Sequence, residues 1–262
     1  MKQLTEAQKA EKKGILELYT CIQTEGSKAG YPNILVRFTG CTHRCYFGEG
    51  GFCDSWYTSW SPEKSLYSIN DVREFMEKHP QISHMMITGG SPTMYPEHVN
   101  ALVNLMHEFH QGDAFVTIET EGSHFIQTDY PIDLVSISPK FSNSLPVLGT
   151  TTPDGKPVTV QMILQHEKFR LNYDAIGDMM DYHKDYHFKP VWNPGDEEMI
   201  EEIEEFRVLM GIPRNKTWMM PGGDTRERLL EIYPVVIEKC IELGYNFSGR
   251  EHILAYDTKR YV

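Results

Sequence analysis

Three of the five cysteines of this chain lie close together in the sequence, and their spacing could support metal chemistry. Cys41 and Cys45 are separated by three residues, and Cys53 follows after a gap of seven residues. Cysteine thiolates are soft ligands that suit iron–sulfur clusters. A cluster held by three cysteines leaves one iron without a protein ligand, and that iron could bind a substrate or a cofactor. The spacing therefore indicates an iron–sulfur site.

Two other interpretations of these cysteines are open at this point. With His43, the three cysteines could form a closed zinc site, which needs four sulfur or nitrogen ligands. A disulfide is less favoured, because residues 1–13 are polar and charged and have no apolar core like that of a secretory signal. We therefore expect a reducing, cytoplasmic compartment. Cys21 and Cys240 stand alone in apolar stretches, and we expect them to be small buried hydrophobic residues.

Composition limits the classes of protein to which the chain could belong. The chain has 262 residues, 40% of them hydrophobic, and no long uncharged apolar run, which predicts a globular protein outside the membrane with one domain over residues 1–262. A formal net charge of -12 argues against a broad basic surface, so no direct nucleic-acid partner is expected. A small anionic substrate is still compatible with this charge if basic residues converge locally.

The elements that would position the cysteines follow from hydrophobic periodicity. Apolar runs of strand length alternate with segments of helical period, which is typical of parallel βα units in an α/β barrel or open sheet. The predicted strands are residues 15–22, 34–39, 84–88, 114–119, 134–138, 187–192 and 217–220. The predicted helices begin near residues 68–70, 96, 196 and 225. Residues 141–186 interrupt the alternation and are expected to form an insertion or lid.

The carboxyl ends of the predicted strands carry many polar and glycine residues. In parallel folds the chemistry gathers at these ends. The segments that follow the strands are residues 23–26, 41–53, 88–92, 119–122, 138–140 and 220–222. The pair Gly89 and Gly90 could form a simple tight turn, but it also allows the backbone to approach a ligand closely because no Cβ intervenes. These segments therefore predict one site that several strand ends build together.

The order of these motifs resembles that of the 7-carboxy-7-deazaguanine synthases, a family of radical S-adenosylmethionine enzymes. The matching motifs are Gln23-x-Glu25-Gly26, Arg37-x-x-Gly40-Cys41-x-x-x-Cys45, Cys53-Asp54-Ser55, Thr88-Gly89-Gly90-x-Pro92, Ile118-Glu119-Thr120-x-Gly122, Ser136-x-Ser138-Pro139-Lys140 and Arg250-x-His252. The resemblance extends from about Tyr19 to the end of the chain and is weakest in residues 141–186. It implies a partial (β/α) barrel of the radical S-adenosylmethionine type with an inserted, lid-like segment.

The resemblance also implies an activity. Members of the family are lyases that contract 6-carboxy-5,6,7,8-tetrahydropterin to 7-carboxy-7-deazaguanine with loss of ammonia, for queuosine or for deazaguanine modification of DNA. It implies a [4Fe–4S] cluster, S-adenosylmethionine and Mg²⁺ as cofactors, an electron donor such as flavodoxin, and a homodimer. An alternative is an activase that abstracts hydrogen from a glycyl-radical partner enzyme. The activase would use the same cluster but would not need a pterin-binding turn or a closing tail.

Roles carried over from the family fall on particular positions. Cys41, Cys45 and Cys53 would ligate the cluster, and the Ser55 hydroxyl would bind Mg²⁺. The residues implied to bind S-adenosylmethionine are Thr88, Gly89, Gly90, Ser91, Glu119, Ser138, Pro139 and Lys140. The residues implied to bind substrate are Ile22, Gln23, Thr24, Glu25, Arg37, Thr88, Arg250, His252 and Val262. Arg37 could grip the substrate carboxylate with two parallel hydrogen bonds, and the tail that ends at Val262 would close over the substrate.

Three features depart from the family pattern. Seven residues, 46–52, separate the last two cysteines where the common radical pattern has two, so we interpret them as a loop insertion and keep Cys53 as the third ligand. Thr24 stands where relatives often have Gly, which could narrow the substrate pocket. Ser91 stands where many relatives have Glu, which removes a negative charge near the methionine amine.

Overall fold

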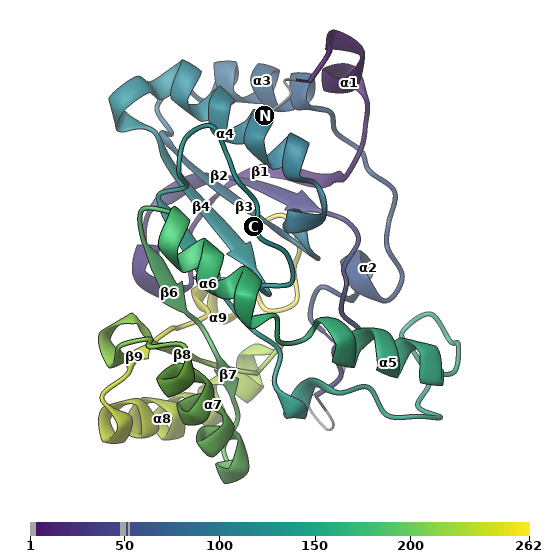
Figure 1. Cartoon of the computed structure of the whole chain (residues 1–262), viewed down its shortest axis with the longest axis vertical. Helices are drawn as coiled ribbons and strands as arrows, with labels where there is room; N and C mark the ends of the chain where they lie inside the picture. The colour runs from purple at the N-terminus through teal and green to yellow at the C-terminus, as the bar shows by residue number, and fades with distance from the viewer. Residues whose placement is uncertain (1–3, 48–50, 52) are drawn as a thin grey trace.

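Two β-sheets organise the part of the chain that this computed structural model describes, residues 4–47, 51 and 53–262 (Figure 1). A six-stranded sheet has the order β1-β2-β3-β4-β5-β6, and a three-stranded sheet has the order β7-β8-β9. The strands are β1 (Ile15–Ile22), β2 (Pro32–Phe38), β3 (His84–Gly89), β4 (Phe115–Thr120), β5 (Leu134–Ile137), β6 (Tyr186–Phe188), β7 (Val191–Trp192), β8 (Trp218–Pro221) and β9 (Asn246–Phe247). The α/β class predicted from the sequence is confirmed.

The larger sheet is parallel except at one edge. Strands β2 to β6 run parallel, whereas β1 is antiparallel to β2. The connection between β1 and β2, residues 23–31, is too short for a crossover, and a short loop can join only antiparallel neighbours. It contains the 3₁₀-helix η1 (Gly26–Lys28). The antiparallel edge strand was not anticipated from the βα pattern.

The sheet is curled, because the loop after β1 packs against β6 at the opposite edge. Gly26 has a φ of +66°, and a Cβ at this position would lie 2.4 Å from Cε1 of His187 on β6. The Oγ of Ser27 lies 3.2 Å from Nδ1 of the same ring. Only glycine fits this conformation and this approach. The two edges of the sheet therefore meet, and they bring the end of β1 to the carboxyl end of β6.

Helices cover the sheets as the periodicity predicted. The α-helices are α1 (Glu6–Ala10), α2 (Trp56–Ser59), α3 (Ile69–Lys78), α4 (Pro96–His110), α5 (Val160–Phe169), α6 (Tyr173–Tyr182), α7 (Glu197–Leu209), α8 (Arg226–Leu243) and α9 (Glu251–Tyr256). Short 3₁₀-helices are η3 (Pro92–Met94), η4 (Gln111–Asp113), η5 (Ser142–Ser144) and η6 (Arg214–Lys216). Ser68 caps α3 and Pro96 occupies the first turn of α4, two start signals that the sequence contains. None of the helices in the described chain combines the length and apolar character of a membrane span.

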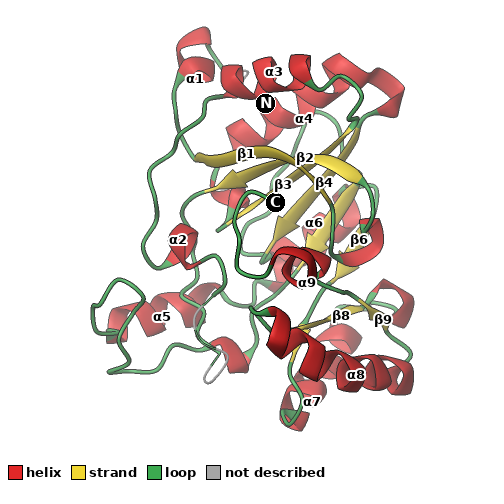
Figure 2. Cartoon of the chain, turned by 180° about the vertical axis from the view of Figure 1, so that it is seen from behind, coloured by secondary structure: helices red, strands yellow, loops and turns green. Residues whose placement is uncertain are grey.

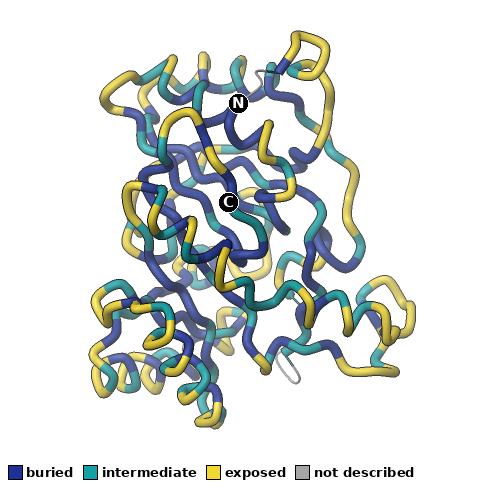
Figure 3. The backbone as a smooth tube through the Cα atoms, in the orientation of Figure 1, coloured by how far each residue is buried: buried dark blue, intermediate teal, exposed yellow. Residues whose placement is uncertain are grey.

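The core lies between the sheet and its helices, where the tube is dark blue in Figure 3. Helix α4 buries the face that its 3.6-residue periodicity predicts. The buried apolar residues on this face are Val99, Leu102, Val103, Leu105 and Met106. The strands between the edges of the sheet are buried on both sides, as expected for parallel strands covered by helices.

The strand predicted over residues 187–192 is two strands that belong to different sheets. Phe188 ends β6, which pairs with β5, and Val191 begins β7, which pairs with β8. Pro190 lies between them and has no N–H to donate to a sheet. The prediction of one continuous strand is therefore wrong, and the break places Lys189 at the carboxyl end of β6.

Residues 141–186 contain two helices with different contacts. Helix α5 lies beside the cysteine loop, where the Nε2 of Gln165 donates to the carbonyl of Thr42 and the N–H of Arg44 donates to Nδ1 of His166. Helix α6 packs on the sheet, and it connects β5 to β6 in the manner of a crossover helix. The C-terminal tail, with α9, lies over the face of the sheet opposite α6 (Figure 2).

A pair of neighbouring leucines on α8 tests how α9 is anchored. Leu229 is fully buried and packs in a small cluster with Ile232 and Ile253, whereas Leu230 is 62% exposed. We expect Leu229→Ala to lower the free energy of unfolding by about 2–5 kcal/mol, because it removes buried methyl groups and leaves a cavity. Leu230→Ala, the matched control, should change it by less than about 0.5 kcal/mol. Urea denaturation measures both, and equal effects would contradict the packing described.

Candidate active site

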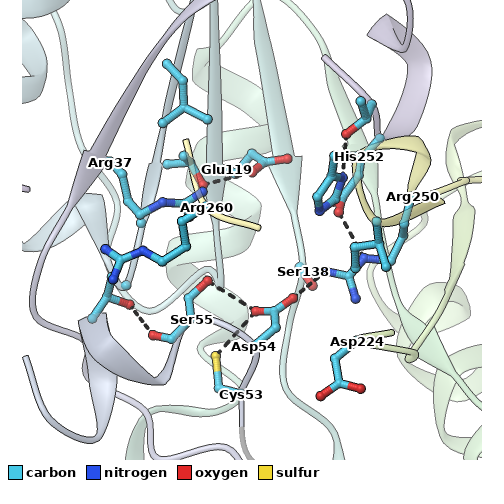
Figure 4. Close-up of a pocket in the computed structure, with 18 of the residues that line it drawn as sticks. Arg37, Cys53, Asp54, Ser55, Glu119, Ser138, Asp224, Arg250, His252 and Arg260 are labelled. Carbon is cyan, nitrogen blue, oxygen red and sulfur yellow. Dashed lines mark hydrogen bonds and ion pairs between the residues drawn. The ribbon is translucent and has the colours of Figure 1, made fainter. Parts of the chain in front are cut away.

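A cavity of about 690 Å³ opens at the carboxyl ends of the strands, between the sheet and the C-terminal tail. Its volume is typical of a site for small molecules. Figure 4 shows the polar side chains that face it. The residues predicted from the sequence that line it are Ile22, Gln23, Thr24, Glu25, Arg37, Cys41, Cys45, Cys53, Ser55, Thr88, Gly89, Gly90, Glu119, Ser138, Lys140, Arg250, His252 and Val262. Ser91 and Pro139 are the two predicted site residues that are not part of the lining.

The three clustered cysteines meet at this cavity as free thiols. The N–H of Cys53 donates to the carbonyl of Cys45 at 3.2 Å, so the chain returns to the second cysteine despite the longer spacing. Burial raises the pKa of Cys53 to about 11 and also raises the pKa values of Cys41 and Cys45 well above the usual range of a thiol. Metal binding requires the thiolates, so the site would bind a metal group with release of protons. Residues 48–50 and 52 of the predicted loop insertion lie outside the described chain.

The zinc interpretation finds no support in the arrangement of these side chains. The described residues contain no group of three or more His, Cys, Asp or Glu side chains arranged around a position for a single ion. The Nδ1 of His43 lies 2.8 Å from the Oγ1 of Thr42, and its buried Nε2 has no hydrogen-bond partner among the described residues. A multi-iron cluster distributes its ligands over several iron atoms and does not need one convergent point. Three cysteines are the ligand set of a cluster with one open iron, whereas a closed zinc site would also need the imidazole of His43.

The Gly89–Gly90 turn packs directly on the cysteine loop. A Cβ at Gly90 would lie 2.2 Å from the carbonyl oxygen of Gly40 and 3.0 Å from the Cβ of Cys41. Gly89 has a φ of +135°, a conformation that side chains rarely adopt. Both glycines are thus required by the close approach of two backbone segments. The turn exposes its backbone to the cavity beside the first cysteine.

Ser91 lies behind the cavity wall and hydrogen-bonds to Glu121, which is part of that wall. Ser91 is completely buried, and its hydroxyl donates to Oε1 of Glu121. Glu121 itself lines the cavity, so the carboxylate beside the Gly89–Gly90 turn comes from the loop after β4. The sequence analysis missed Glu121, although it belongs to the Glu119-Thr120-x-Gly122 motif at a strand end.

Lys189 is a second residue that the sequence analysis missed. Its Nζ donates to Oε2 of Glu25 at 2.5 Å and to Oε1 of Glu119 at 2.9 Å, and the other oxygen of Glu119 accepts from Oγ1 of Thr88 at 2.8 Å. Burial alone would raise the pKa of Glu25, but Lys189 and Arg250 hold it well below its usual range. Lys189 was overlooked because the wrongly predicted strand placed it inside a strand instead of at its end.

Arg250 connects the tail helix to two loops of the site. Its Nε donates to Oε1 of Glu25 at 3.2 Å, and its Nη2 donates to Oδ2 of Asp54 (Figure 4). Burial opposes ionisation of Asp54, but the Arg250 guanidinium lowers the pKa of this carboxyl group to about 2. Nearby, Oγ1 of Thr24 lies 2.7 Å from Nδ1 of His252. The predicted substrate residues of the β1 turn and of the tail are thus in contact.

Arg37 is held by a buried carboxylate that also receives the tail. Its Nε donates to Oε2 of Glu17 at 2.6 Å, and Oε1 of Glu17 accepts from Nε of Arg260 at 3.0 Å. Glu17 is 1% exposed. The guanidinium of Arg260 lies 3.6 Å from the ring centroid of Tyr57, and it also pairs with Glu63. The tail is therefore fixed to β1 through Glu17, the same carboxylate that holds Arg37 of β2.

The remaining predicted residues make local contacts at the cavity wall. The Ser55 hydroxyl donates to Oδ1 of Asp54 at 3.1 Å. The Nζ of Lys140 donates to the carbonyl and to the hydroxyl of Ser138, at 2.7 and 2.9 Å. Gln23 is buried, and its Oε1 accepts from the N–H of Thr24. These groups border the cavity.

Comparisons with known proteins give a consistent result. No family model matches the chain. The chain is 30% identical over 246 residues to the 7-carboxy-7-deazaguanine synthase of Halobacterium salinarum, which covers 93% of this chain and 90% of the relative. It is 28% identical to the synthase of Rhodopirellula baltica, with 94% and 87% covered. The crystal structure of QueE from Escherichia coli superposes with a TM-score of 0.58 at 18% identity, over 93% of this chain and 96% of that chain, which shows a shared fold.

Removal of the buried lysine tests the electrostatics of the site. We expect Lys189→Met to lower the free energy of unfolding by about 3–5 kcal/mol, because Glu25 and Glu119 lose their shared partner. In the native protein the ionised carboxylate of Glu25 contributes to stability at pH values above about 4.3, the pKa of Glu in an unfolded chain. This contribution is lost as the pH falls below that value. In the variant, the acid-dependent loss should be smaller because the native pKa of Glu25 rises.

Denaturation with urea between pH 3 and pH 7 measures both effects. Lys156→Met is the matched control, because Lys156 is 72% exposed and pairs only at the surface with Asp154. It should leave both the stability and its pH profile nearly unchanged. An unaltered pH profile in Lys189→Met would contradict the assignment of Lys189 as the group that keeps Glu25 ionised.

Proposed function

Because this chain belongs to the 7-carboxy-7-deazaguanine synthases, we propose that its cavity contracts 6-carboxy-5,6,7,8-tetrahydropterin to 7-carboxy-7-deazaguanine with loss of ammonia. The activity belongs to deazapurine biosynthesis. One observation carries the proposal for this site: the three thiols, the glycine turn and the charged groups of the β1 turn and tail all line a single cavity. The synthase needs this combination, because cofactor and substrate must meet at one place.

The family uses an iron–sulfur cluster and S-adenosylmethionine. We infer that Cys41, Cys45 and Cys53 hold a [4Fe–4S] cluster, and that the turn after β3 with Glu119, Ser138 and Lys140 binds S-adenosylmethionine. The bound groups supply a 5′-deoxyadenosyl radical. The side chains of the chain bind and orient the substrate and exclude side reactions.

The substrate would be held by groups of opposite charge on two sides of the cavity. Arg37 can bind the substrate carboxylate with its terminal nitrogens, since its Nε is engaged by Glu17. Glu25 stays ionised at neutral pH and can accept hydrogen bonds from a 2-amino-pyrimidinone edge. Each oxygen of Glu25 already accepts one hydrogen bond, from Lys189 or from Arg250, and has a second lone pair that can accept from the substrate.

A divalent cation fits beside the third cysteine. The Ser55 hydroxyl and the ionised carboxylate of Asp54 are hard oxygen ligands, and Mg²⁺ prefers such ligands together with water. We propose that the Ser55 hydroxyl binds Mg²⁺ directly and that Asp54 lies in the outer coordination sphere of the ion. The Arg250–Asp54 pair would then couple this ion to the position of the tail helix.

Several broader features are proposed from the family resemblance. They are a single domain over residues 1–262 with an insertion at 141–186, a homodimer, a cytoplasmic location and a flavodoxin-like electron donor. Within the insertion, α5 contacts the cysteine loop and could shield the cluster from solvent. The alternative function, activation of a glycyl-radical enzyme, would require neither the charged β1 turn nor the tail contacts. No observation of this chain favours that activase.

An anaerobic assay tests the proposed function directly. Protein reconstituted with iron and sulfide should convert 6-carboxy-5,6,7,8-tetrahydropterin to 7-carboxy-7-deazaguanine and release 5′-deoxyadenosine, in the presence of S-adenosylmethionine, reductant and Mg²⁺. Mass spectrometry follows both products. Cys53→Ala should abolish both products and reduce the iron content, because the cluster loses a ligand. Cys240→Ala is the control, since Cys240 is buried outside the cavity and should leave the iron content intact.

The two products separate the possible outcomes of this assay. Formation of 5′-deoxyadenosine without the deazapurine would overturn the substrate assignment and favour the activase. A Cys53→Ala protein with a normal iron content and normal turnover would show that the third ligand lies elsewhere. Colourless protein without iron after reconstitution would reject the cluster.

The tail gives a second test of the proposed site. Arg260→Ala should raise KM for the pterin roughly fivefold, because a partly exposed ion pair and a ring contact together contribute about 1 kcal/mol. The iron content should not change, since the ion pairs and the closest ring contact of Arg260 in the described chain are with Glu17, Glu63 and Tyr57 and involve no cysteine. A bulky extension after Val262 should likewise impair turnover more than cluster assembly. Equal loss of iron and turnover in either protein would mean that the tail is only structural.

A further inference from the structure

The backbone of the cysteine loop is held by the chain segment that contains η5 and α5. The N–H of Arg44 donates to Nδ1 of His166 at 3.0 Å, and the N–H of Tyr46 donates to the carbonyl of Ser144 at 2.9 Å. Arg44 and Tyr46 are the two neighbours of Cys45 in the sequence. The two backbone donors that flank the second cysteine are therefore both engaged by one distant segment.

The hydrogen bonds of His166 fix which of its nitrogens carries the proton. A backbone N–H can only donate, so Nδ1 accepts from Arg44 and the proton of the neutral ring lies on Nε2. The residue is completely buried, and burial lowers its pKa to about 3, so the ring is neutral at pH 7. Nε2 then donates to the Ser144 hydroxyl at 3.0 Å, and this hydroxyl donates to the carbonyl of Phe141 at 2.6 Å. The ring is thus held at both nitrogens and presents a fixed acceptor to the cysteine loop.

A third N–H of the loop shows the alternative to this arrangement. The N–H of His43 donates to the Sγ of Cys41 at 3.4 Å. Reduction adds a negative charge to an iron–sulfur cluster, so N–H donors to its sulfur atoms stabilise the reduced form and raise the reduction potential. Because each N–H carries a single proton, the donors bound by His166 and Ser144 are withheld from the sulfur atoms around Cys45.

We propose that His166 is a positioning residue that keeps the reduction potential of the cluster low, because it withholds the Arg44 N–H from the cluster sulfur atoms. The inference rests on the proposed function, since it needs a cluster on the three clustered cysteines. A low potential makes the reduced cluster a strong electron donor, which the reductive cleavage of S-adenosylmethionine requires. His166 is not part of the cavity lining, so it acts through the loop and not on a ligand.

Neighbouring contacts keep the loop in place beside His166. The Nε2 of Gln165 donates to the carbonyl of Thr42 at 3.1 Å, so the contacts of this segment fall on every second residue of the loop. The rings of His43 and His166 also meet edge to face, with 5.2 Å between their centroids. The loop is therefore held at several points. A single substitution at position 166 should free the Arg44 N–H without unfolding the loop.

A redox titration of the reconstituted holoenzyme tests the proposal. His166→Leu removes the acceptor, so at a fixed ambient potential we expect the ratio of reduced to oxidised cluster to rise about tenfold, which corresponds to about 59 mV for one electron. His166→Asn places an oxygen acceptor close to the position of Nδ1 and should stay within twofold of the native ratio. Titanium(III) citrate is the titrant, and electron paramagnetic resonance spectroscopy measures the reduced cluster.

His183 provides a matched control elsewhere in the fold. It is buried, its Nδ1 accepts from the N–H of Ile132 at 3.1 Å, and it is not part of the cavity lining. His183→Leu therefore removes the same type of hydrogen bond away from the cysteine loop, and it should leave the ratio within twofold of the native value. Equal shifts in His166→Leu and His183→Leu, or no shift in a fully loaded His166→Leu, would overturn the proposal.

Electron–nuclear double resonance of the reduced cluster tests the physical cause of the shift. His166→Leu should show an additional proton coupling that disappears in D₂O, because the freed N–H turns to a cluster sulfur. His166→Asn should show the native couplings only. A raised potential without the additional coupling would overturn the proposed mechanism.

A second variant keeps the test valid if His166→Leu does not retain the cluster. Ser144→Ala removes the hydroxyl that holds Nε2, so the ring can turn and its bond to the Arg44 N–H weakens. We expect the ratio of reduced to oxidised cluster to rise about threefold. An unchanged ratio in Ser144→Ala with a native iron content would overturn the role of His166.

The titration needs no pterin, so its outcome is separate from that of the proposed function. The expected shift in a protein that makes no deazapurine would support His166 and overturn the substrate assignment. Normal deazapurine formation without a shift in His166→Leu would overturn the role of His166 alone. A native protein that holds no cluster would overturn both.

Discussion

The buried ion pairs of Lys189 determine how the site is built. Its ammonium group bridges Glu25, which follows the first strand of the sheet, and Glu119 on the fourth strand. Removing Lys189 would leave Glu119 without a charged partner among the described residues and Glu25 with Arg250 alone, which is unfavourable. The two edges of the curled sheet are therefore held together at the cavity. Arg250 extends the network to the tail helix through Glu25 and Asp54.

Close backbone packing provides the second constraint. The glycine turn after β3 approaches the cysteine loop so closely that no side chain fits at Gly90. The turn and the loop therefore keep a fixed separation, and a cofactor that binds both is positioned relative to the cysteines. The charged network lies on the other side of the same cavity and would position the substrate. Rigid packing on one side and paired charges on the other suit a reaction in which a radical must meet one hydrogen atom.

Two buried carboxylates of the site, Glu121 and Glu17, are each held by side chains from distant segments of the chain. Ser91 carries no charge, and its hydroxyl donates to the buried carboxylate of Glu121 from a different loop. Likewise, Glu17 is buried beneath Arg37 and divides its two oxygens between that residue and Arg260 of the tail. In both cases the buried carboxylate itself lines the cavity and is held by a side chain from another segment. Neither contact joins residues that are close in the sequence.

The sequence alone determined the elements and the cysteines, because hydrophobic periodicity, helix caps and ligand spacing are local properties of the chain. The α/β class, the buried face of α4 and the grouping of Cys41, Cys45 and Cys53 at one cavity followed from such signals. The tertiary structure decided the split at Pro190, the placement of Lys189 and the pairing of Ser91 with Glu121. These features depend on which distant segments meet when the sheet curls, and on where buried charges find partners. No local pattern specifies either.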